Sequence, residues 1–432
     1  MILVVGAGPA GLSAAYHLQS DHLILEREPE PGGLCRSFEL GGTTFDLGGH
    51  AFFTRHDYVR ALITELSSTG LYTQPRNACV YSHGTYIQYP FQTNLHSLPI
   101  NVVRECLTGL YESLADRRNG RVRDVNEWIN RSFGSGISRH FLTPYNEKLW
   151  AYSLDEISPD WTSERVVTAD FDVIVAGALT RVDFKDFPNA TVAYPAEGGF
   201  WGLYEGFVPL VADRLRRATV EAVNLRRRYV ITDTGERLPY DYLISTMPLN
   251  ELVAAAEDAP ASCRQAAASL RYTSLYLVNL VIDRPGVTEM QRVYVADPSI
   301  PFHKLAVNSN SSASLRSLPR SAIQGEVSWS PHKPVEREGL EQRVLDSLIR
   351  MGIVHRSDHV VATSVVTLEY AYPIYTKQTA DARKHLLKTL ERKGVFCAGR
   401  FGEWLYINSD DAVMRGKLRA EALNTQLAGT RS

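Results

Sequence analysis

Cysteine is scarce in this chain, and its cysteines show no pairing pattern. Five occur among 432 residues, and no two of them form a C-x-x-C pair: Cys35, Cys79, Cys106, Cys263 and Cys397. An odd and scattered set argues against a disulfide framework, which uses cysteines in pairs, and the lack of C-x-x-C argues against a zinc site. The sequence therefore predicts no structural metal and favours a reducing, cytoplasmic environment.

An excess of charge of either sign is also missing. Lysine and arginine total 46 and aspartate and glutamate 48, which gives a net charge of −2 and no electrostatic basis for binding nucleic acid. No apolar run reaches membrane-spanning length, and the first residues lack the basic start of a signal peptide. We therefore expect a globular protein with no membrane association, long enough for two or three lobes.

What the chain does have is a glycine-rich turn near its start. The segment MILVVGAGPAGLSAAYHL is a short β-rich run, a turn and a helical pattern, and its Gly6, Gly8 and Gly11 have the spacing G-x-G-x-x-G. The first glycine of this motif permits the tight turn, the second lets the backbone approach a pyrophosphate, and the third lets helix and strand pack closely. The helix N-terminus then presents N–H groups to the phosphates. The segment predicts a dinucleotide site.

A carboxylate after the next predicted strand narrows the choice of dinucleotide. Glu26 ends the run HLILE, where it can accept both hydroxyls of an adenosine ribose, which suits FAD or NAD better than NADP. Gly32-Gly33 follows, then Arg36, which is placed to neutralise the pyrophosphate. For Gly48-Gly49-His50 we favour a flavin contact over an ordinary hairpin turn. This continuation resembles the large flavoprotein group that includes amine oxidases and protoporphyrinogen oxidase, and it favours FAD.

The C-terminal segment GVFCAGRFGEWLYINSDDAVM has the pattern of a closing strand and helix. The strand ends at Ala398-Gly399 and the helix begins near Asp410. In flavoproteins of this group such a segment returns to the flavin. We therefore predict one FAD-binding domain assembled from residues 1–60, 190–250 and 390–432, with Gly399 and Asp410 near the cofactor.

Between these pieces the hydrophobic pattern changes. Helical spacing predicts a mainly helical domain, which we place at 61–189, and alternation over 228–247 predicts a hairpin with its turn at Asp233–Gly235, followed by a strand of the FAD domain. Runs such as SLYLVNLVI and GEVSWS predict a β-sheet substrate domain over 251–389. The predicted fold class is α/β: a Rossmann-like FAD-binding domain with an inserted helical domain and a mixed or antiparallel substrate-sheet domain.

Aromatic, amide and cationic residues gather in several loops of these domains, as in YPFQ (89–92), FLTPYNEKLW (141–150), EYAYPIYT and GRFGEWLY. Each aromatic taken singly is most simply a core residue. Together, flat aromatics, amides and cations suit a ligand that carries a base, a diphosphate and hydroxyls, because rings stack on the base, amides read its edge and cations bind phosphate.

The motifs resemble those of the UDP-galactopyranose mutases, and the eukaryotic-type branch more than the bacterial one. The resemblance covers most of the chain, through GAGPAGL, GGLCRS, GGHAFF, YPFQ, PYNEKLW, YPAEGG, ISTMP, PFHK, AYPIYT and GRFGEW. The glycine motifs are common to amine-oxidase-like flavoproteins, whereas YPFQ, PYN-x-K-x-W and GRFG-x-W-x-Y in this order are specific to the mutases.

The resemblance implies roles for particular residues. Phe141 would stack on uracil, in a uridine pocket that also contains Tyr89, Phe91, Gln92, Asn146 and Trp150. Arg165 and Lys304 would clamp the diphosphate, whose oxygens would be bound by Tyr294, Tyr372 and Tyr406. His50 would touch the flavin and Arg400 would lie near flavin and sugar, so the predicted catalytic residues are His50, Arg165, Lys304 and Arg400.

The chain departs from the family at two places that matter. Lys304, preceded by His303 in place of the usual tyrosine, stands where the family has arginine, and a lysine cannot make a planar two-pronged contact with phosphate. Tyr375 replaces a proline of the family pattern. We expect weaker or differently oriented diphosphate binding, and the sugar is left open.

The reaction implied by the resemblance is a ring contraction without net redox, catalysed by an isomerase of the intramolecular transferase type. Reduced FAD would attack the anomeric carbon of a UDP-sugar through N5, UDP would leave, and the sugar would reclose through another hydroxyl; NADPH and NADH are candidate reductants, and a homo-oligomer is implied. The alternatives are a mutase for another nucleotide sugar, a redox flavoenzyme of the amine- or protoporphyrinogen-oxidase kind, and a flavin-carrying binding protein.

Overall fold

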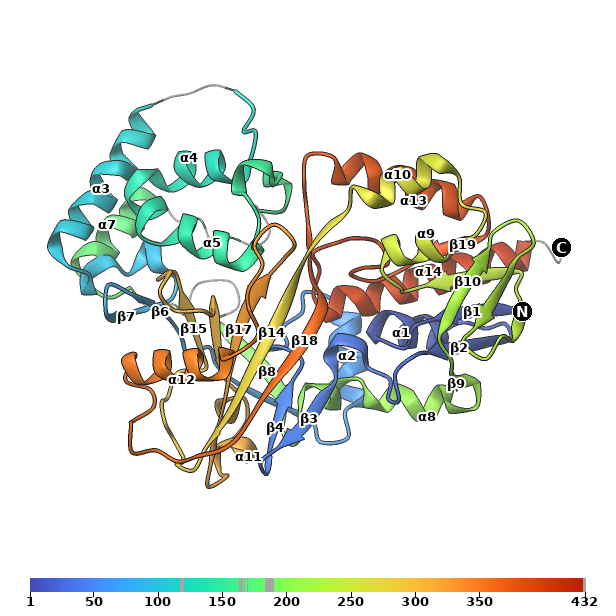
Figure 1. Ribbon diagram of the computed structural model, residues 1–432, viewed down its shortest axis with the longest axis horizontal. Coiled ribbons are helices and arrows are strands. Elements are labelled where there is room, and N and C mark those ends of the chain that lie inside the picture. The colour runs from blue at the N-terminus through green and yellow to red at the C-terminus, as the bar shows by residue number, and fades with distance from the viewer. Residues whose placement is uncertain (117–119, 163–165, 167, 169, 183–189, 430–432) are drawn as a thin grey trace.

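The computed structural model describes the chain except for residues 117–119, 163–165, 167, 169, 183–189 and 430–432. Three regions are visible in Figure 1: a group of helices around α3 and α4, a large central sheet around β14 and β18, and a sheet around β1 flanked by helices. The predicted α/β fold class is confirmed. Within the described residues, no helix combines the length and apolar character that a membrane crossing requires.

A parallel sheet with the order β19-β13-β1-β2-β9 contains the N-terminal strand. Its strands are β1 (Ile2–Val5), β2 (His22–Glu26), β9 (Leu215–Arg217), β13 (Tyr242–Ser245) and β19 (Val395–Cys397). Every residue of β1 is buried, as a parallel strand covered on both faces must be. Ile2 and Val4 belong to one core cluster, and Leu3 and Val5 to the other.

Helices from both ends of the chain cover this sheet. α1 (Pro9–His17) packs against α14 (Ser409–Gly429), and a Cβ atom at Gly416 would lie 2.1 Å from the Ala10 carbonyl oxygen, so the close approach needs glycine. The opposite core cluster includes residues of α9 (Leu249–Ala255), α10 (Ala261–Ala268) and α13 (Thr379–Glu391). The N- and C-terminal segments therefore share one core.

The predicted hairpin is confirmed. β11 (Tyr229–Thr232) pairs antiparallel with β12 (Arg237–Pro239), and β10 (Val220–Asn224) pairs with the other edge of β11. The Gly235 N–H donates to the Thr232 carbonyl at 2.8 Å, which closes the turn. The chain then enters the parallel sheet as β13.

The central sheet has seven strands in the order β18-β14-β17-β16-β15-β6-β7, and all its pairs are antiparallel except β15–β6. Its strands are β6 (Ala78–Ser82), β7 (Thr85–Gln88), β14 (Arg271–Ile282), β15 (Arg292–Val295), β16 (Lys304–Val307), β17 (Ser321–Trp329) and β18 (Val360–Ile374). α12 (Leu340–Arg350) packs on one face. β6 and β7 lie within the range 61–189, so strand pairing crosses that proposed domain boundary.

The helical region consists of α3 (Ile100–Ala115), α4 (Val125–Ile137), α5 (Thr143–Trp150) and α7 (Phe171–Leu179). α3 and α4 cross closely at glycines, since a Cβ atom at Gly134 would lie 2.2 Å from the Gly109 carbonyl oxygen. A π-helical turn (Ser138–Leu142) joins α4 to α5. α2 (Asp57–Leu66) and the short pairs β3 (Ser37–Leu40) with β4 (Thr43–Asp46) and β5 (Leu71–Pro75) with β8 (Thr191–Pro195) complete the frame around the site.

Candidate active site

The turn after β1 forms a close cradle at the N-terminus of α1. Gly6 has a φ of +93°, and a Cβ atom at Gly11 would lie 1.9 Å from the Gly6 carbonyl oxygen. Gly8 stands as the N-cap of α1, opposite Gly33, whose Cα would be 3.7 Å from a Cβ atom at Gly8. The glycines thus leave the first N–H groups of α1 open to a bound phosphate.

The predicted ribose carboxylate lies beside this cradle. Glu26 is 9% exposed at the end of β2 and accepts the N–H groups of Ala7 at 2.6 Å and Glu28 at 2.9 Å. Arg36 donates to the Gly33 carbonyl and pairs with Glu28 at 2.9 Å. A glycine turn, a helix N-terminus, a carboxylate and an arginine are the groups that the ADP half of FAD requires, so these residues fit the cofactor.

The loop Gly48–His50 is tied to the central sheet. The Gly49 N–H donates to Glu326 Oε1 at 2.7 Å, and Arg292 donates to the His50 carbonyl at 2.6 Å. The His50 ring stacks on Phe200 at 4.7 Å. Burial, with a contribution from the nearby Lys304, lowers the pKa of His50 to about 3, so the ring is neutral at physiological pH. The loop therefore presents an uncharged imidazole.

A buried carboxylate beside this loop was missed by the sequence reasoning. Glu326 is 0% exposed on β17 and pairs with Lys304 on the neighbouring strand at 2.8 Å. His303 lies 3.6 Å from its other oxygen. Burial alone would raise the pKa of Glu326, but Lys304, His303 and the Gly49 N–H outweigh it and lower the pKa. Glu326 is therefore an ionised partner of Lys304.

Two cavities adjoin next to this pair. The inner cavity, of about 290 Å³, is lined by the Gly48–His50 loop, Tyr194, Glu326 and Arg400. The outer cavity, of about 760 Å³, extends into the helical region. Both are lined by the same belt of residues: Phe53, Arg76, Tyr294, Lys304, Tyr372, Tyr406 and Asn408. A ligand that reaches from one cavity into the other must pass three positions that carry phenol groups and two that carry cations.

Aromatic and amide side chains form one wall of the outer cavity. Tyr89, Gln92, Phe141 and Asn146 line it, and the Phe141 ring is nearly parallel to Tyr145 at a centroid distance of 5.2 Å. The flat face and the amides can serve a nucleobase.

Two residues predicted for this pocket lie behind its wall instead. Phe91 is 0% exposed and its ring is nearly parallel to that of Phe141 at a centroid distance of 4.9 Å, and Trp150 is 1% exposed against Trp161 and Tyr406. Neither is among the residues that line the outer cavity. Both belong to the core of the helical region, and their sequence neighbours Gln92 and Leu149 line the cavity in their place.

Cations converge on the belt between the cavities. Arg76 donates to the Tyr294 hydroxyl at 2.6 Å, and its guanidinium lies 4.7 Å from the centre of the Tyr89 ring. Burial raises the pKa of Tyr294, but Arg76, Lys304 and Arg292 outweigh it and lower the pKa. Arg400 lies over the rings of Tyr372 and Tyr406 at 5.2 and 5.1 Å. This arrangement favours an anionic ligand at the belt.

Tyr375, one of the departures from the mutase pattern, has a structural role at the belt. Its hydroxyl accepts the backbone N–H of Tyr406 at 2.7 Å, and its carbonyl accepts the Ser158 N–H at 2.6 Å. The tyrosine therefore fixes the backbone of Tyr406, which lines both cavities.

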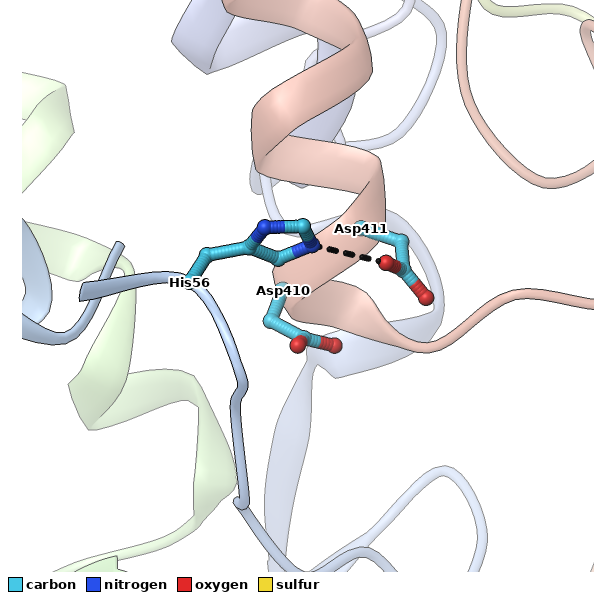
Figure 2. A group of neighbouring side chains, drawn as sticks. All are labelled: His56, Asp410 and Asp411. Atoms are coloured by element: carbon cyan, nitrogen blue, oxygen red, sulfur yellow. Dashed lines mark hydrogen bonds and ion pairs between the residues drawn. The ribbon is translucent and has the colours of Figure 1, made fainter. Parts of the chain in front are cut away.

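Three potential metal ligands lie together beside the outer cavity (Figure 2). His56 Nε2 is 3.0 Å from Asp411 Oδ1, and Asp410 lies beside them in the first turn of α14, with the ligand atoms all within 4.8 Å of one another. Asp411 also accepts the Asn408 N–H at 3.4 Å, as helix N-terminal acids do. Burial, then Asp411, raises the pKa of Asp410, which Thr54 hydrogen-bonds. These bonds give both carboxylates a structural role, and we assign no ion to them.

The predicted site residues thus have different outcomes. His50, Gly49, Lys304, Tyr294, Tyr372, Tyr406 and Arg400 come together around the inner cavity, and Asp410 lines the outer one. Gly399 has a φ of +87°, and a Cβ atom there would lie 2.8 Å from Ala10 Cβ, which places it beside the start of α1. Arg165 lies outside the described residues. The sequence analysis missed Arg76, Arg292 and Glu326. For Glu326 a signal was available, because it is a charged residue inside the strand-like run AIQGEVSW.

The fold and the glycine cradle define an FAD-binding α/β flavoprotein. The sequence matches the family of flavin-containing amine oxidoreductases over residues 9–424, and the chain belongs to that family.

Individual relatives differ in their reactions. A crystal structure of reduced UDP-galactopyranose mutase is similar to this chain with a TM-score of 0.94 and 27% identity, over 98% of this chain and 94% of that one. Coproporphyrinogen III oxidase of Mycobacterium bovis is 26% identical over 332 residues, which are 70% of this chain and 71% of that protein. Wild-type putrescine oxidase bound to putrescine shares the fold, with a TM-score of 0.67 and 16% identity over 98% of each chain.

Proposed function

We propose that this chain is an FAD-dependent mutase that interconverts the pyranose and furanose forms of a UDP-sugar, with UDP-galactose as the candidate substrate and no net redox change. The observation that carries the proposal is the pair of adjoining cavities. The outer one has a wall suited to a nucleobase, the belt is suited to a diphosphate, and the inner one adjoins the Gly48–His50 loop. A UDP-sugar presents these three parts in the same order.

The residues would act by positioning rather than by side-chain nucleophilic attack. Phe141 would stack on uracil while Gln92 and Asn146 bond its edge. The tyrosines and cations of the belt would hold the leaving diphosphate, and that charge stabilisation would lower the barrier to breaking the glycosidic bond. When bound and reduced, FAD would supply the nucleophile.

The finer assignments belong to this proposal. The order of the motifs favours the eukaryotic-type branch of the mutases, with NADPH or NADH as reductant and a cytoplasmic, homo-oligomeric enzyme. Arg165 remains a candidate ligand of the diphosphate. We also propose the division into an FAD-binding domain (1–60, 190–250 and 390–432), a helical domain (61–189) and a substrate-sheet domain (251–389).

Oxidation of a porphyrinogen is the second candidate, and the similarity to coproporphyrinogen III oxidase favours it. The wall of the outer cavity favours the mutase, because buried amides at Gln92 and Asn146, 3% and 6% exposed, suit the edge of a base.

One experiment separates these candidates. The holoprotein, reduced by dithionite without oxygen, is mixed with UDP-galactofuranose, and the products are separated by ion-exchange chromatography. We expect UDP-galactopyranose from the reduced protein and almost none from the oxidised protein. The parallel sample receives coproporphyrinogen III and air. Oxygen uptake with porphyrin formation, together with no turnover of any UDP-sugar, would contradict the proposal.

A further inference from the structure

The guanidinium of Arg76 lies at the belt between the two cavities. Arg76 follows β5 directly and lines both cavities. One nitrogen donates to the Tyr294 hydroxyl, and the plane lies over the Tyr89 ring. In the described part of the chain, no carboxylate pairs with Arg76 and its other N–H groups make no hydrogen bond. A desolvated cation in this position is stabilised when an anion binds next to it.

Lys304 lies on the same belt but has a partner already. Its ammonium is 2.8 Å from Glu326, which is fully buried and also accepts the Gly49 N–H. Strand pairing places Lys304 directly opposite Glu326 on one side and Tyr294 on the other. Moving the ammonium to a phosphate would take the cation away from a buried carboxylate, which would keep the Gly49 N–H and the Tyr372 hydroxyl as neutral donors. Losing the cation costs more than a phosphate contact provides.

Arg292 is committed in a similar way. Its guanidinium donates to the carbonyls of His50 and Gln291. Arg292 and Lys304 therefore both hold the Gly48–His50 loop, one through its carbonyl and the other through Glu326. Of these cations, Arg76 has the planar fork and the open donors that two phosphate oxygens require.

We propose that Arg76 makes the two-pronged contact to the substrate diphosphate, and that Lys304 is a positioning residue that pairs with Glu326 and so keeps the Gly48–His50 loop in place. The inference rests on the proposed function and changes the role that the motif pattern assigns to Lys304. It also explains how a lysine can stand where the related mutases have arginine, because Arg76, directly after β5, supplies the planar guanidinium.

The test measures ligand binding to the oxidised holoprotein by calorimetry, with UDP and with uridine as the neutral control. The variants are Arg76→Gln, Arg76→Lys and the matched Lys304→Gln, each checked for flavin content. We expect Arg76→Gln to weaken UDP binding by roughly tenfold to a hundredfold and uridine binding by less than about threefold. Arg76→Lys should recover part of the loss, since it restores the charge but not the fork.

The matched variant gives a different result if Lys304 is a positioning residue. Lys304→Gln should reduce UDP affinity less than Arg76→Gln does, and it should shift the flavin midpoint potential and visible spectrum. The inference is overturned if Arg76→Gln leaves UDP affinity unchanged, if UDP and uridine weaken equally, or if Lys304→Gln causes the larger loss of UDP affinity with an unchanged flavin spectrum. A wild-type holoprotein that binds neither UDP nor uridine would contradict the proposed function itself.

Discussion

Replacing Glu326 with glutamine would remove the negative charge between the Lys304 ammonium and the Gly49 N–H. Glu326 is 0% exposed, and its contacts measure 2.8 Å to Lys304 and 2.7 Å to Gly49. Breaking a buried pair from one side costs about 3–5 kcal/mol, because the remaining charge is left uncompensated. We therefore expect the free energy of unfolding of the holoprotein to fall by about that amount. Urea unfolding followed by flavin fluorescence and circular dichroism measures it.

The pH dependence has a definite sign. The surrounding groups hold the pKa of Glu326 below its usual value of 4.5 in the folded protein. Its contribution is therefore complete above the unfolded pKa and is lost as pH falls through the folded pKa. The stability difference between wild type and Glu326→Gln should be constant around pH 6 to 8 and shrink in acid below about pH 4.

The controls test the cause. Glu221→Gln makes the same chemical change at an exposed position of β10 and should alter stability by less than about 0.5 kcal/mol. The double variant Glu326→Gln/Lys304→Gln should lose less free energy of unfolding than the two single variants lose in sum, by about 1.5–3 kcal/mol. Strictly additive losses would show that Glu326 and Lys304 do not stabilise each other and would refute the assigned ion pair.

Three further perturbations test the cofactor cradle, the cavity wall and the imidazole. Gly11→Ala should yield protein with little flavin by absorbance, because its Cβ would lie 1.9 Å from the Gly6 carbonyl oxygen; a full flavin complement would contradict the cradle. Phe91→Ala should cost about 3–5 kcal/mol of stability in urea but less UDP affinity than Phe141→Ala, since Phe91 lies behind the wall; equal affinity losses would refute that placement. His50, with a pKa lowered to about 3 by burial, should contribute no inflection to the rate profile between about pH 5 and 8; an inflection that His50→Gln abolishes would show that the ring titrates there.

The cofactor cradle is the part of the site that sequence predicts best. β1, the glycine turn and α1 are contiguous, so the spacing of Gly6, Gly8 and Gly11 dictates their geometry before any long-range contact forms. The hairpin at Asp233–Gly235 was predictable for the same reason. The seven-stranded sheet was predictable only as a class, because β6 joins it by pairing with β15, more than 200 residues away, and carries β7 with it to the sheet edge.

The binding surface between the cavities was harder to predict because it depends on register. Nothing local marks Glu326 as the partner of Lys304; the pairing of β16 with β17 brings them together. Phe91 and Trp150 were expected at the pocket because the mutase-like motifs YPFQ and PYNEKLW contain them, whereas each taken singly reads as a core residue. Arg76 stands in TQPRNACV, which carries no motif, and its role follows from the contacts with Tyr89 and Tyr294.

The central claim is that the reduced flavoprotein rearranges a UDP-sugar without consuming its reducing equivalents. The most direct measurement follows the sugar ring form by proton NMR and the flavin by visible absorbance in one anaerobic sample of reduced holoprotein and UDP-galactofuranose. We predict many product molecules per flavin while the flavin stays reduced. Flavin reoxidation in proportion to product, or a substrate that stays unchanged beside a fully reduced flavin, would contradict the account.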